Sequence, residues 1–293
     1  MGFRIVTIKS RSKLDLKLNY LVCRGEVESR VFIPEISFLI LENTAISLTA
    51  ALISELIKNN VKIIFCDEKH NPESELIGLK ENYSPLKKIK SQMSWNDQIK
   101  GEVWREIVKE KISKQRDFLK ELGFKKEVEL LTTYTEQIEF NDATNREGHA
   151  AKVYFNAVFG MDFQRRTATY TNEALNYGYA VISSAFNREI TKAGYLLPLG
   201  IWHKNEFNYF NLSSDFMEPF RILVDKVVYG LKNGDNYKFA ILSLFDKKLE
   251  IGGKLQSLEN AIGAYVHSLF YALNKRDFSL IKFYKIKEIG NEK

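Results

Sequence analysis

The hydrophobic pattern of this chain changes its period once, near residue 80, and this change constrains the fold. In the first 80 residues, apolar residues occur in short runs or alternate with polar ones, as between Lys13 and Val22. Alternation with a period of two is typical of β-strands that bury one face. One helix is expected over about residues 47–59, so the pattern predicts a small β-rich domain over residues 1–80. The other short apolar runs lie at residues 3–8, 30–33, 38–41, 61–66 and 76–79.

The pattern lapses between residues 81 and 98, where a proline and a lysine-rich stretch replace aligned apolar positions. We expect a linker there. From residue 99 the period is helical, and apolar residues follow one side of a long amphipathic helix that ends at Gly123. The sequence therefore predicts an α+β protein, with a β-rich N-terminal domain (1–80), a linker (81–98) and a larger, predominantly α-helical C-terminal domain (99–293). The later elements expected are helices over about 142–159, 171–193, 214–229 and 258–273, a hairpin turn at 252–253 and a strand-like tail at 280–286.

The composition is typical of a globular protein in water, with 45% hydrophobic and 27% charged residues. No apolar run is long enough to cross a bilayer, and the N-terminus lacks the apolar block and cleavage site of a signal peptide. Cys23 and Cys66 lie within apolar runs, which predicts buried free thiols in a reducing compartment. We therefore expect a cytoplasmic protein without membrane contact.

The net charge of +6 is distributed unevenly. Residues 1–85 contain 11 basic and 11 acidic side chains, so the whole excess lies in residues 86–293. A local basic excess attracts polyanions such as nucleic acids. A slightly basic solvated surface explains the same charge equally well, so this feature favours nucleic acid as a partner without deciding the question.

The segment over residues 201–225 carries the main candidate for chemistry. On the helix expected there, Asp215, Glu218 and Arg221 follow one another at intervals of three residues and share one face. His203 precedes Glu218 by 15 positions. Carboxylates and an imidazole, with no thiolate nearby, are ligands that suit Mg²⁺ and Mn²⁺. The segment therefore resembles part of an oxygen and nitrogen metal site.

Each of these residues also has a structural interpretation. Asp215 can open its helix as the N-cap, with Glu218 completing a capping box. His203, which follows Trp202, can be a packed or hydrogen-bonded residue of the fold. Taken singly, none of the three specifies a metal site.

Glu147 is the third acidic candidate. It lies in the first turns of the helix expected over residues 142–159, and the small Ala150 and Ala151 nearby leave room for a ligand or DNA to approach. An ordinary acidic residue at a helix N-terminus, favoured by the helix dipole, is the alternative. Nothing in the sequence spacing brings Glu147 near His203 and Glu218.

Asn172 and Asn176 recur at helical spacing among apolar residues of the helix expected over 171–193. Buried asparagines need hydrogen-bond partners. They either orient the ligands of a site from behind or clamp a neighbouring loop, and we favour the clamp.

Other chemistries lack their motifs. The sequence contains no glycine-rich phosphate loop, no nucleophile elbow and no paired CxxC. Neither cysteine has an evident activating histidine or base, which argues against a thiol nucleophile.

Four segments occur in a fixed order along the second half: EGHAAKVYF, NEALNYGYAVISSAF, LPLGIWHKN and NLSSDFMEPFRILVD. In this order, and with this length and domain pattern, the chain resembles the CRISPR-associated endonuclease/integrase, the universal subunit of spacer acquisition. The resemblance covers nearly the whole chain. The amino-acid sequences of these segments are most similar to those of type II-A systems.

The resemblance implies a metal site formed by a glutamate, a histidine and a further acidic residue. Carried over by motif, these are Glu147, His203 and Glu218, with Asp215 as an accessory carboxylate. Many relatives resemble this chain at the aspartate, so the choice between Asp215 and Glu218 as the main ligand stays open. The resemblance also implies Mn²⁺ or Mg²⁺ as cofactor and DNA as substrate.

The same resemblance implies partners. It implies a homodimer, with contacts made by the β-rich domain, and two such dimers that flank a dimer of a small ferredoxin-like subunit in a heterohexamer. Double-stranded DNA fragments and CRISPR repeat DNA are the implied nucleic acids. The RNA-guided effector nuclease and an end-binding ring protein are further partners of type II systems.

Phosphodiester exchange fits these residue types, because a divalent ion held by carboxylates and imidazole needs no protein nucleophile. Arg146, Lys152, Lys204 and Arg221 lie close to the candidate ligands in sequence and can grip phosphates. Arg221, one turn from Glu218, is expected to be a structural ion-pair partner. Two other classes stay open, a non-catalytic DNA-binding scaffold and a metal hydrolase of small molecules.

Overall fold

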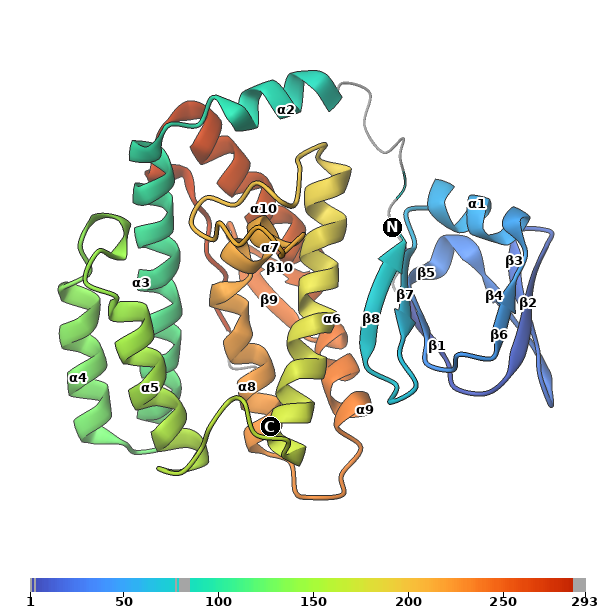
Figure 1. The fold of residues 1–293 in the computed structure, drawn as a ribbon, viewed down its shortest axis with the longest axis horizontal. Coiled ribbons are helices and arrows are strands. Elements are labelled where there is room, and N and C mark those ends of the chain that lie inside the picture. Colours follow the sequence, from blue (N-terminus) through green and yellow to red (C-terminus); the bar gives the residue numbers. More distant parts are fainter. Residues whose placement is uncertain (1, 3, 77, 79–84, 287–293) are drawn as a thin grey trace. The chain divides into compact units, whose positions relative to one another are not determined.

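The structure is a computed structural model that describes residues 2, 4–76, 78 and 85–286. The chain divides into two compact units, Met1–Glu81 and Asn82–Lys293 (Figure 1). The first unit is built mainly from β-strands and the second mainly from helices, which confirms the predicted α+β class. None of the described helices combines the length and the apolar character that crossing a membrane requires.

The described residues of the first unit form two four-stranded sheets. One has the order β1-β5-β7-β8 and the other β4-β3-β2-β6. In the first sheet β1, β5 and β7 run parallel, and β8 pairs with β7 in the antiparallel direction. The strands are β1 (Arg4–Ile8), β2 (Ser12–Lys17), β3 (Tyr20–Arg24), β4 (Glu28–Phe32), β5 (Ile36–Leu41), β6 (Ile46–Leu48), β7 (Lys62–Cys66) and β8 (Pro72–Leu76).

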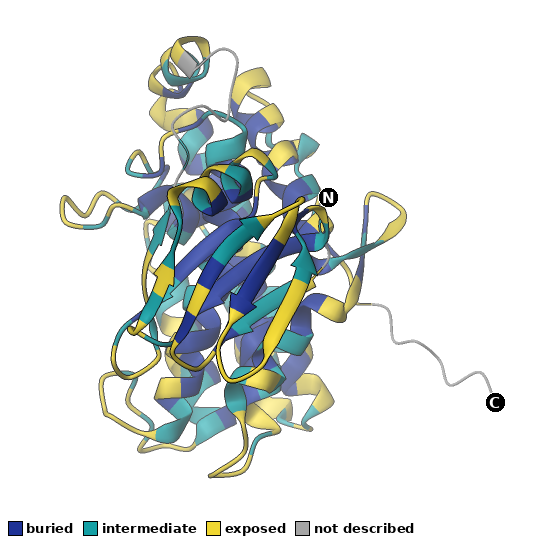
Figure 2. Cartoon of the chain, turned by 90° about the vertical axis from the view of Figure 1, so that its right-hand side faces the viewer, coloured by how far each residue is buried: buried dark blue, intermediate teal, exposed yellow. Residues whose placement is uncertain are grey.

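The core of this unit lies between the sheets and helix α1 (Ala50–Lys58), which Thr49 caps by accepting a hydrogen bond from the Leu52 amide. Every residue of β5 is buried, as expected for a central parallel strand covered on both faces. Figure 2 shows buried and exposed residues along the strands of this unit. Cys23 and Cys66 are both buried, as predicted.

The alternating run from Lys13 to Val22 is a hairpin of two strands. Its turn is made by Leu18 and Asn19, whose φ angles are 48° and 64°. A two-residue turn keeps the alternation in phase across both strands, so the sequence pattern alone reads as one strand. Leu18 is 84% exposed at this turn. The apolar run expected at 76–79 lies mostly outside the described residues.

The second unit is a helical bundle around two long helices, α3 and α6 (Figure 1). α3 packs against α4 and α5, and α6 packs against α7, α8, α9 and α10. The helices are α2 (Pro85–Met93), α3 (Asp97–Glu121), α4 (Lys125–Glu136), α5 (Arg146–Phe159), α6 (Tyr170–Lys192), α7 (Asn211–Phe216), α8 (Arg221–Tyr229), α9 (Tyr237–Leu242) and α10 (Leu258–Lys275). Short 3₁₀ turns η1 (Ile33–Glu35), η2 (Phe140–Asp142), η3 (Glu218–Phe220), η4 (Ser243–Asp246) and η5 (Phe278–Leu280) connect elements of both units.

Several expectations for this unit need correction. Helix α2 forms within the segment expected as a linker, and α4 and α9 were not expected at all. The hairpin turn at Gly252 and Gly253 is present between β9 (Lys248–Ile251) and β10 (Lys254–Ser257). The strand expected at 280–286 is wrong, because only an isolated bridge from Lys285 to Glu250 forms there.

The helix expected over 214–229 is broken into α7, η3 and α8. Pro219 is the cause, because proline cannot donate a backbone hydrogen bond and its ring clashes with the preceding turn. Asp215 and Glu218 therefore belong to different helical segments. The capping-box interpretation is wrong, since Phe210 is the N-cap of α7 and neither acidic side chain caps a helix.

Candidate functional site

Glu147 is held in place by the way α5 begins. The Asp142 carboxylate accepts hydrogen bonds from the amides of Arg146 and Glu147, at 2.8 and 3.1 Å. Asn145, in the left-handed conformation, accepts a further bond from Gly148 at 3.3 Å. Burial raises the pKa of Asp142. These caps fix the first turn of α5 and therefore the direction of the Glu147 side chain, which is 28% exposed.

Glu218 opens η3, directly before Pro219, and its side chain is only 6% exposed. Arg221 donates from Nε to Glu218 Oε1 at 2.9 Å, and Lys111 donates from Nζ to Oε2 at 2.5 Å. Burial by itself would raise the pKa of Glu218, but the charges of Arg221 and Lys111 outweigh it and lower the pKa to about 2. Glu218 is therefore an anion in a dry environment.

Lys111, on α3, joins the two glutamates. Its Nζ lies 2.5 Å from Glu147 Oε1 as well as 2.5 Å from Glu218 Oε2. The lysine is buried, which lowers its pKa, but Glu218 and Glu147 outweigh this effect and the pKa is raised. One ammonium thus ties α3, α5 and η3 together at the candidate site.

His203 is oriented by Asp215, which is fully buried. Asp215 Oδ2 accepts from the amides of Ile201 and Trp202 at 2.7 and 3.0 Å, and Oδ1 accepts from the His203 amide at 3.1 Å. His203 Nδ1 lies 2.5 Å from the same Oδ1. A carboxylate only accepts hydrogen bonds, so Nδ1 carries the proton and Nε2 of the neutral ring keeps its lone pair. The hydrogen bond to Asp215 raises the pKa of His203.

The loop before His203 is shaped around this carboxylate. A Cβ at Gly200 would lie 2.5 Å from the His203 carbonyl oxygen and 2.8 Å from Asp215 Oδ2, so only glycine fits. The Trp202 ring stacks on Trp104 of α3, with centroids 5.4 Å apart, and the Trp104 ring meets the His203 ring edge-on at 5.8 Å. Local hydrogen bonds and aromatic packing together fix the imidazole.

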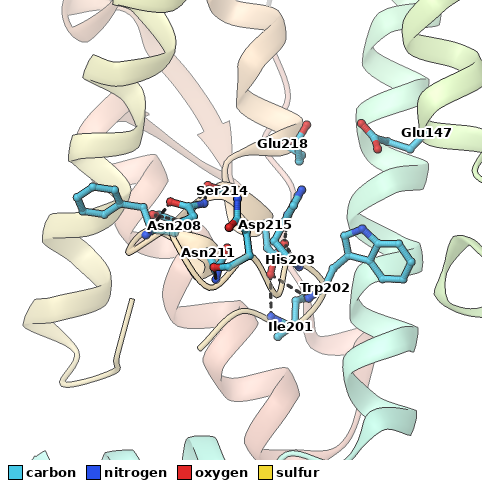
Figure 3. A network of polar contacts seen from close by, with 12 residues as sticks. Glu147, Ile201, Trp202, His203, Asn208, Asn211, Ser214, Asp215 and Glu218 are labelled. Carbon is cyan, nitrogen blue, oxygen red and sulfur yellow. Dashed lines mark hydrogen bonds and ion pairs between the residues drawn. The ribbon is translucent and has the colours of Figure 1, made fainter. Parts of the chain in front are cut away.

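The structure brings the predicted residues into one region (Figure 3). Figure 3 shows the carboxylates of Glu147 and Glu218 facing each other, with His203 and Asp215 beside them. Both glutamates raise the pKa of His203 through their charge, so their fields reach the imidazole. Glu147 and Glu218 also line a cavity of about 240 Å³ with Lys111.

The donor types suit a hard divalent cation, and the two glutamates already hold a positive charge between them. Across residues 2, 4–76, 78 and 85–286, no three histidine, cysteine or acidic side chains are spaced as ligands of one ion. The point between the carboxylates is taken by Lys111. The oxygens of Asp215 already serve three amides and an imidazole, which makes it the residue that positions His203.

Asn172 and Asn176 form the clamp that the sequence favoured. Asn172 donates from Nδ2 to the carbonyl oxygens of Gln164 and Thr167 at 2.7 and 2.9 Å, and so holds the loop before α6. Both asparagines also accept from Arg165, at 2.6 Å for Asn172 Oδ1 and 2.8 Å for Asn176 Oδ1.

Arg165 is a candidate that the sequence reasoning missed. Its guanidinium lies over the rings of Tyr179 and Phe155 at 5.3 and 6.0 Å, and it lines the same cavity as Glu147. Within the described part of the chain, its hydrogen-bond partners are neutral amide oxygens. The two asparagines one helical turn apart were the available signal, because amide oxygens at that spacing can orient one guanidinium.

The four cations expected to contact DNA occupy different environments. Arg221 is an ion-pair partner of Glu218 and lies 4.7 Å from the Tyr179 ring centroid, as its structural interpretation predicted. Arg146 lies 5.4 Å from the ring centroid of Tyr134. Lys152 and Lys204 are exposed. Their contact with DNA stays a prediction.

Comparison with known proteins identifies a matching family and a similar relative. Residues 5–255 match the family described as CRISPR associated protein Cas1. A CRISPR-associated endonuclease Cas1 of Neisseria meningitidis serogroup C (strain 8013) is 35% identical over 232 residues, which are 79% of this chain and 76% of that protein. The expected type II-A subtype stays a prediction.

Solved structures agree in fold. A casposase bound to integration product superposes with a TM-score of 0.76 at 18% identity, covering 95% of this chain and 93% of that one. A chain of a Cas6-RT-Cas1--Cas2 complex gives a TM-score of 0.78 at 16% identity and covers 98% of this chain, which spans only 36% of that longer chain. At these identities the likeness concerns the fold alone.

Proposed function

The chain belongs to the Cas1 family of CRISPR-associated proteins, and on that premise we propose that it is a metal-dependent DNA endonuclease and integrase of CRISPR adaptation. It joins the 3′-hydroxyl ends of captured DNA fragments to the CRISPR repeat by phosphodiester exchange. Water in place of the 3′-hydroxyl gives the nuclease reaction.

One observation carries the proposal. Two carboxylates from separate elements, Glu147 on α5 and Glu218 on η3, converge on a single cation, and an imidazole with a defined tautomer stands beside them. Removing charged groups from water costs free energy. Clusters of charged groups with shifted pKa values at a cavity are therefore commonly functional sites. The charge pattern suits a cationic cofactor.

Glu147, His203 and Glu218 would hold Mn²⁺ or Mg²⁺, with His203 binding through Nε2. When bound, the ion supplies activation of the attacking hydroxyl and neutralisation of charge on the phosphate. Asp215 fixes the tautomer and direction of the imidazole. Arg221 keeps Glu218 ionised and in place.

Arg165 is placed to hold a DNA phosphate at the cavity. Its guanidinium is pre-oriented by Asn172 and Asn176, and an oriented guanidinium pairs with phosphate in a bidentate manner. Lys152 and Lys204, both exposed, add sequence-independent attraction to the DNA backbone.

The proposed assembly is a homodimer that works with a small ferredoxin-like subunit as a heterohexamer in the cytoplasm. The RNA-guided effector nuclease and an end-binding ring protein are proposed as further partners. The fold likeness to a chain of a Cas1–Cas2 complex supports the association with a second subunit.

An integration assay tests the function. Full-length protein, with its small partner subunit, is incubated with Mn²⁺, a 3′-hydroxyl DNA fragment and a plasmid carrying the repeat. We expect joined product with the wild type and with the control Glu129→Gln, an exposed acid on α4. Glu147→Gln and His203→Ala should abolish joining while DNA binding persists.

A non-catalytic DNA-binding scaffold is the second candidate, favoured by the Lys111 ammonium that already pairs with both glutamates. It predicts DNA binding by all variants and no metal-dependent product. Joining that survives in both Glu147→Gln and His203→Ala would show that the proposed site is wrong.

A further inference from the structure

The buried ammonium of Lys111 has no part in the reaction described above. Its side chain is only 10% exposed, and lysines are seldom buried unless they are paired. It is paired twice, at 2.5 Å, with glutamates 36 and 107 residues away in the sequence. Nothing in the helix itself requires a charge here, because the neighbouring buried positions of α3 are uncharged: Ile107, Val108 and Ile112 are apolar, and Gln115 is a neutral amide.

The two glutamates need a cation whether or not a metal is present. Carboxylates that share one site repel each other, and without a positive charge one of them would be driven to bind a proton. Lys111 meets this need from within the chain. A divalent ion held by the same oxygens meets it too, and two cations cannot occupy the same point.

We propose that Lys111 is a resident counter-cation that occupies the ion position between Glu147 and Glu218 and is displaced when the divalent ion binds. This inference rests on the proposed metal-dependent function. The displaced side chain has room in the 240 Å³ cavity that it lines, where a DNA phosphate becomes its new partner.

Such an exchange makes the site selective for ion charge. A monovalent ion that replaces the ammonium brings no additional charge to the two carboxylates, and it must also expel a tethered competitor at high local concentration. A divalent ion brings one more unit of charge and gains from it. Lys111 therefore allows Mn²⁺ and Mg²⁺ to bind at this position and prevents K⁺ and Na⁺ from binding there.

Calorimetric titration of DNA-free protein with MnCl₂ tests the exchange. Lys111→Met removes the competitor, so it should bind Mn²⁺ at least about tenfold more tightly than the wild type. Lys111→Arg keeps the charge and should bind no more tightly than the wild type. The matched control is Lys109→Met, which removes an exposed lysine from the same helix and should leave the affinity unchanged.

Thermal unfolding gives a second measure. In EDTA, Lys111→Met should melt at a lower temperature than the wild type, because Glu147 loses its ion-pair partner and Arg221 alone then balances the charge of Glu218. Added Mn²⁺ should raise its melting temperature by more than it raises that of the wild type.

Wild-type protein provides a test that needs no variant. Acetylation followed by mass spectrometry should find Lys111 protected without metal and more reactive with saturating Mn²⁺, whereas Lys109 reacts equally in both. This result decides the matter if Lys111→Met does not fold.

Glu147→Ala separates the two levels of the proposal. If it abolishes Mn²⁺ binding and Lys111→Met binds no more tightly than the wild type, the metal site stands and the exchange is wrong. Unchanged protection of Lys111 at saturating Mn²⁺ also overturns the exchange. If Glu147→Ala binds Mn²⁺ like the wild type, the proposed metal site itself fails, and the exchange with it.

Discussion

Asp225 allows a quantitative test of the electrostatics behind the site. It is 1% exposed on α8, and the Tyr179 hydroxyl donates to its Oδ1 at 2.5 Å. Burial raises the pKa of Asp225 from 3.8 to about 6, although Tyr179, Arg221 and Lys111 act in the opposite direction. The folded protein therefore holds a proton that the unfolded chain releases at lower pH.

The sign and size of the effect follow from this difference. Between pH 3.8 and about 6 the unfolded chain is ionised first, so the free energy of unfolding falls as the pH rises and levels off above the folded pKa. A shift of about 2 pKa units corresponds to about 3 kcal/mol in total. About 2 kcal/mol of this falls between pH 4.5 and 7.5.

Asp225→Asn removes the titration and keeps an oxygen that accepts from Tyr179. We expect the stability of the variant relative to the wild type to rise by about 2 kcal/mol between pH 4.5 and 7.5. Reversible urea unfolding of the DNA-free, metal-free protein at a series of pH values measures this difference. Any constant effect of the amide cancels, because each pair is compared at the same pH. A relative stability that is flat or falls with rising pH would refute the argument.

Three further predictions concern the frame of the site. Asp215→Ala leaves one buried and two part-buried amides without an acceptor, so urea unfolding should show a loss of about 3–5 kcal/mol; a loss below about 1 kcal/mol would contradict the role drawn from its contacts. Gly178→Ala places a Cβ 2.3 Å from Val224 Cγ1 and should lower the free energy of unfolding by about 1–3 kcal/mol. Adding Val224→Ala should restore most of this loss. An equal loss in the single variant Gly178→Ala and in the double variant would exclude the clash. Arg165→Ala should lower the salt dependence of DNA binding by about one phosphate contact in fluorescence anisotropy titrations, and an unchanged slope would remove Arg165 from the DNA surface.

Much of the architecture was predictable because it depends on local periodicity. The alternation of the first unit and the helical period of the second appear directly in the sequence, and strands predominate in the first unit and helices in the second, as expected. The break at Pro219 was also predictable from local chemistry, since proline rarely continues a helix. It was missed because apolar residues keep a helical spacing across it.

The hydrogen bonds around Asp215 could not be predicted in the same way. The carboxylate is used by backbone amides, which carry no sequence signature, and the loop that presents them is identified only by Gly200 and the residues that follow it. Spacing alone could not distinguish such an anchor from a metal ligand. The geometry separates Asp215, which is enclosed, from Glu218, whose carboxylate lines a cavity.

The position of Lys111 was itself a signal in the sequence, but an argument from apolar periodicity ignores charged residues. On α3 it falls, together with Gln115, on the stripe that also buries Ile107, Val108 and Ile112. A charged residue on a buried stripe requires a partner, and the two acidic candidates elsewhere in the sequence were in need of one. Pairing unexplained buried cations with unexplained acids would have suggested that Glu147 and Glu218 approach each other.

The two halves of the site are therefore assembled by different means. His203 and Asp215 are 12 residues apart and are joined by a loop that closes on itself, so this half depends on local sequence. Glu147 and Glu218 meet only because α3 stands between their elements and offers Lys111 to both. The same helix presents Trp104 to the His203 ring. Since α3 contacts both halves and contributes no proposed ligand, its packing sets the distance between imidazole and carboxylates, and a substitution on its buried face can change that distance while leaving each half intact.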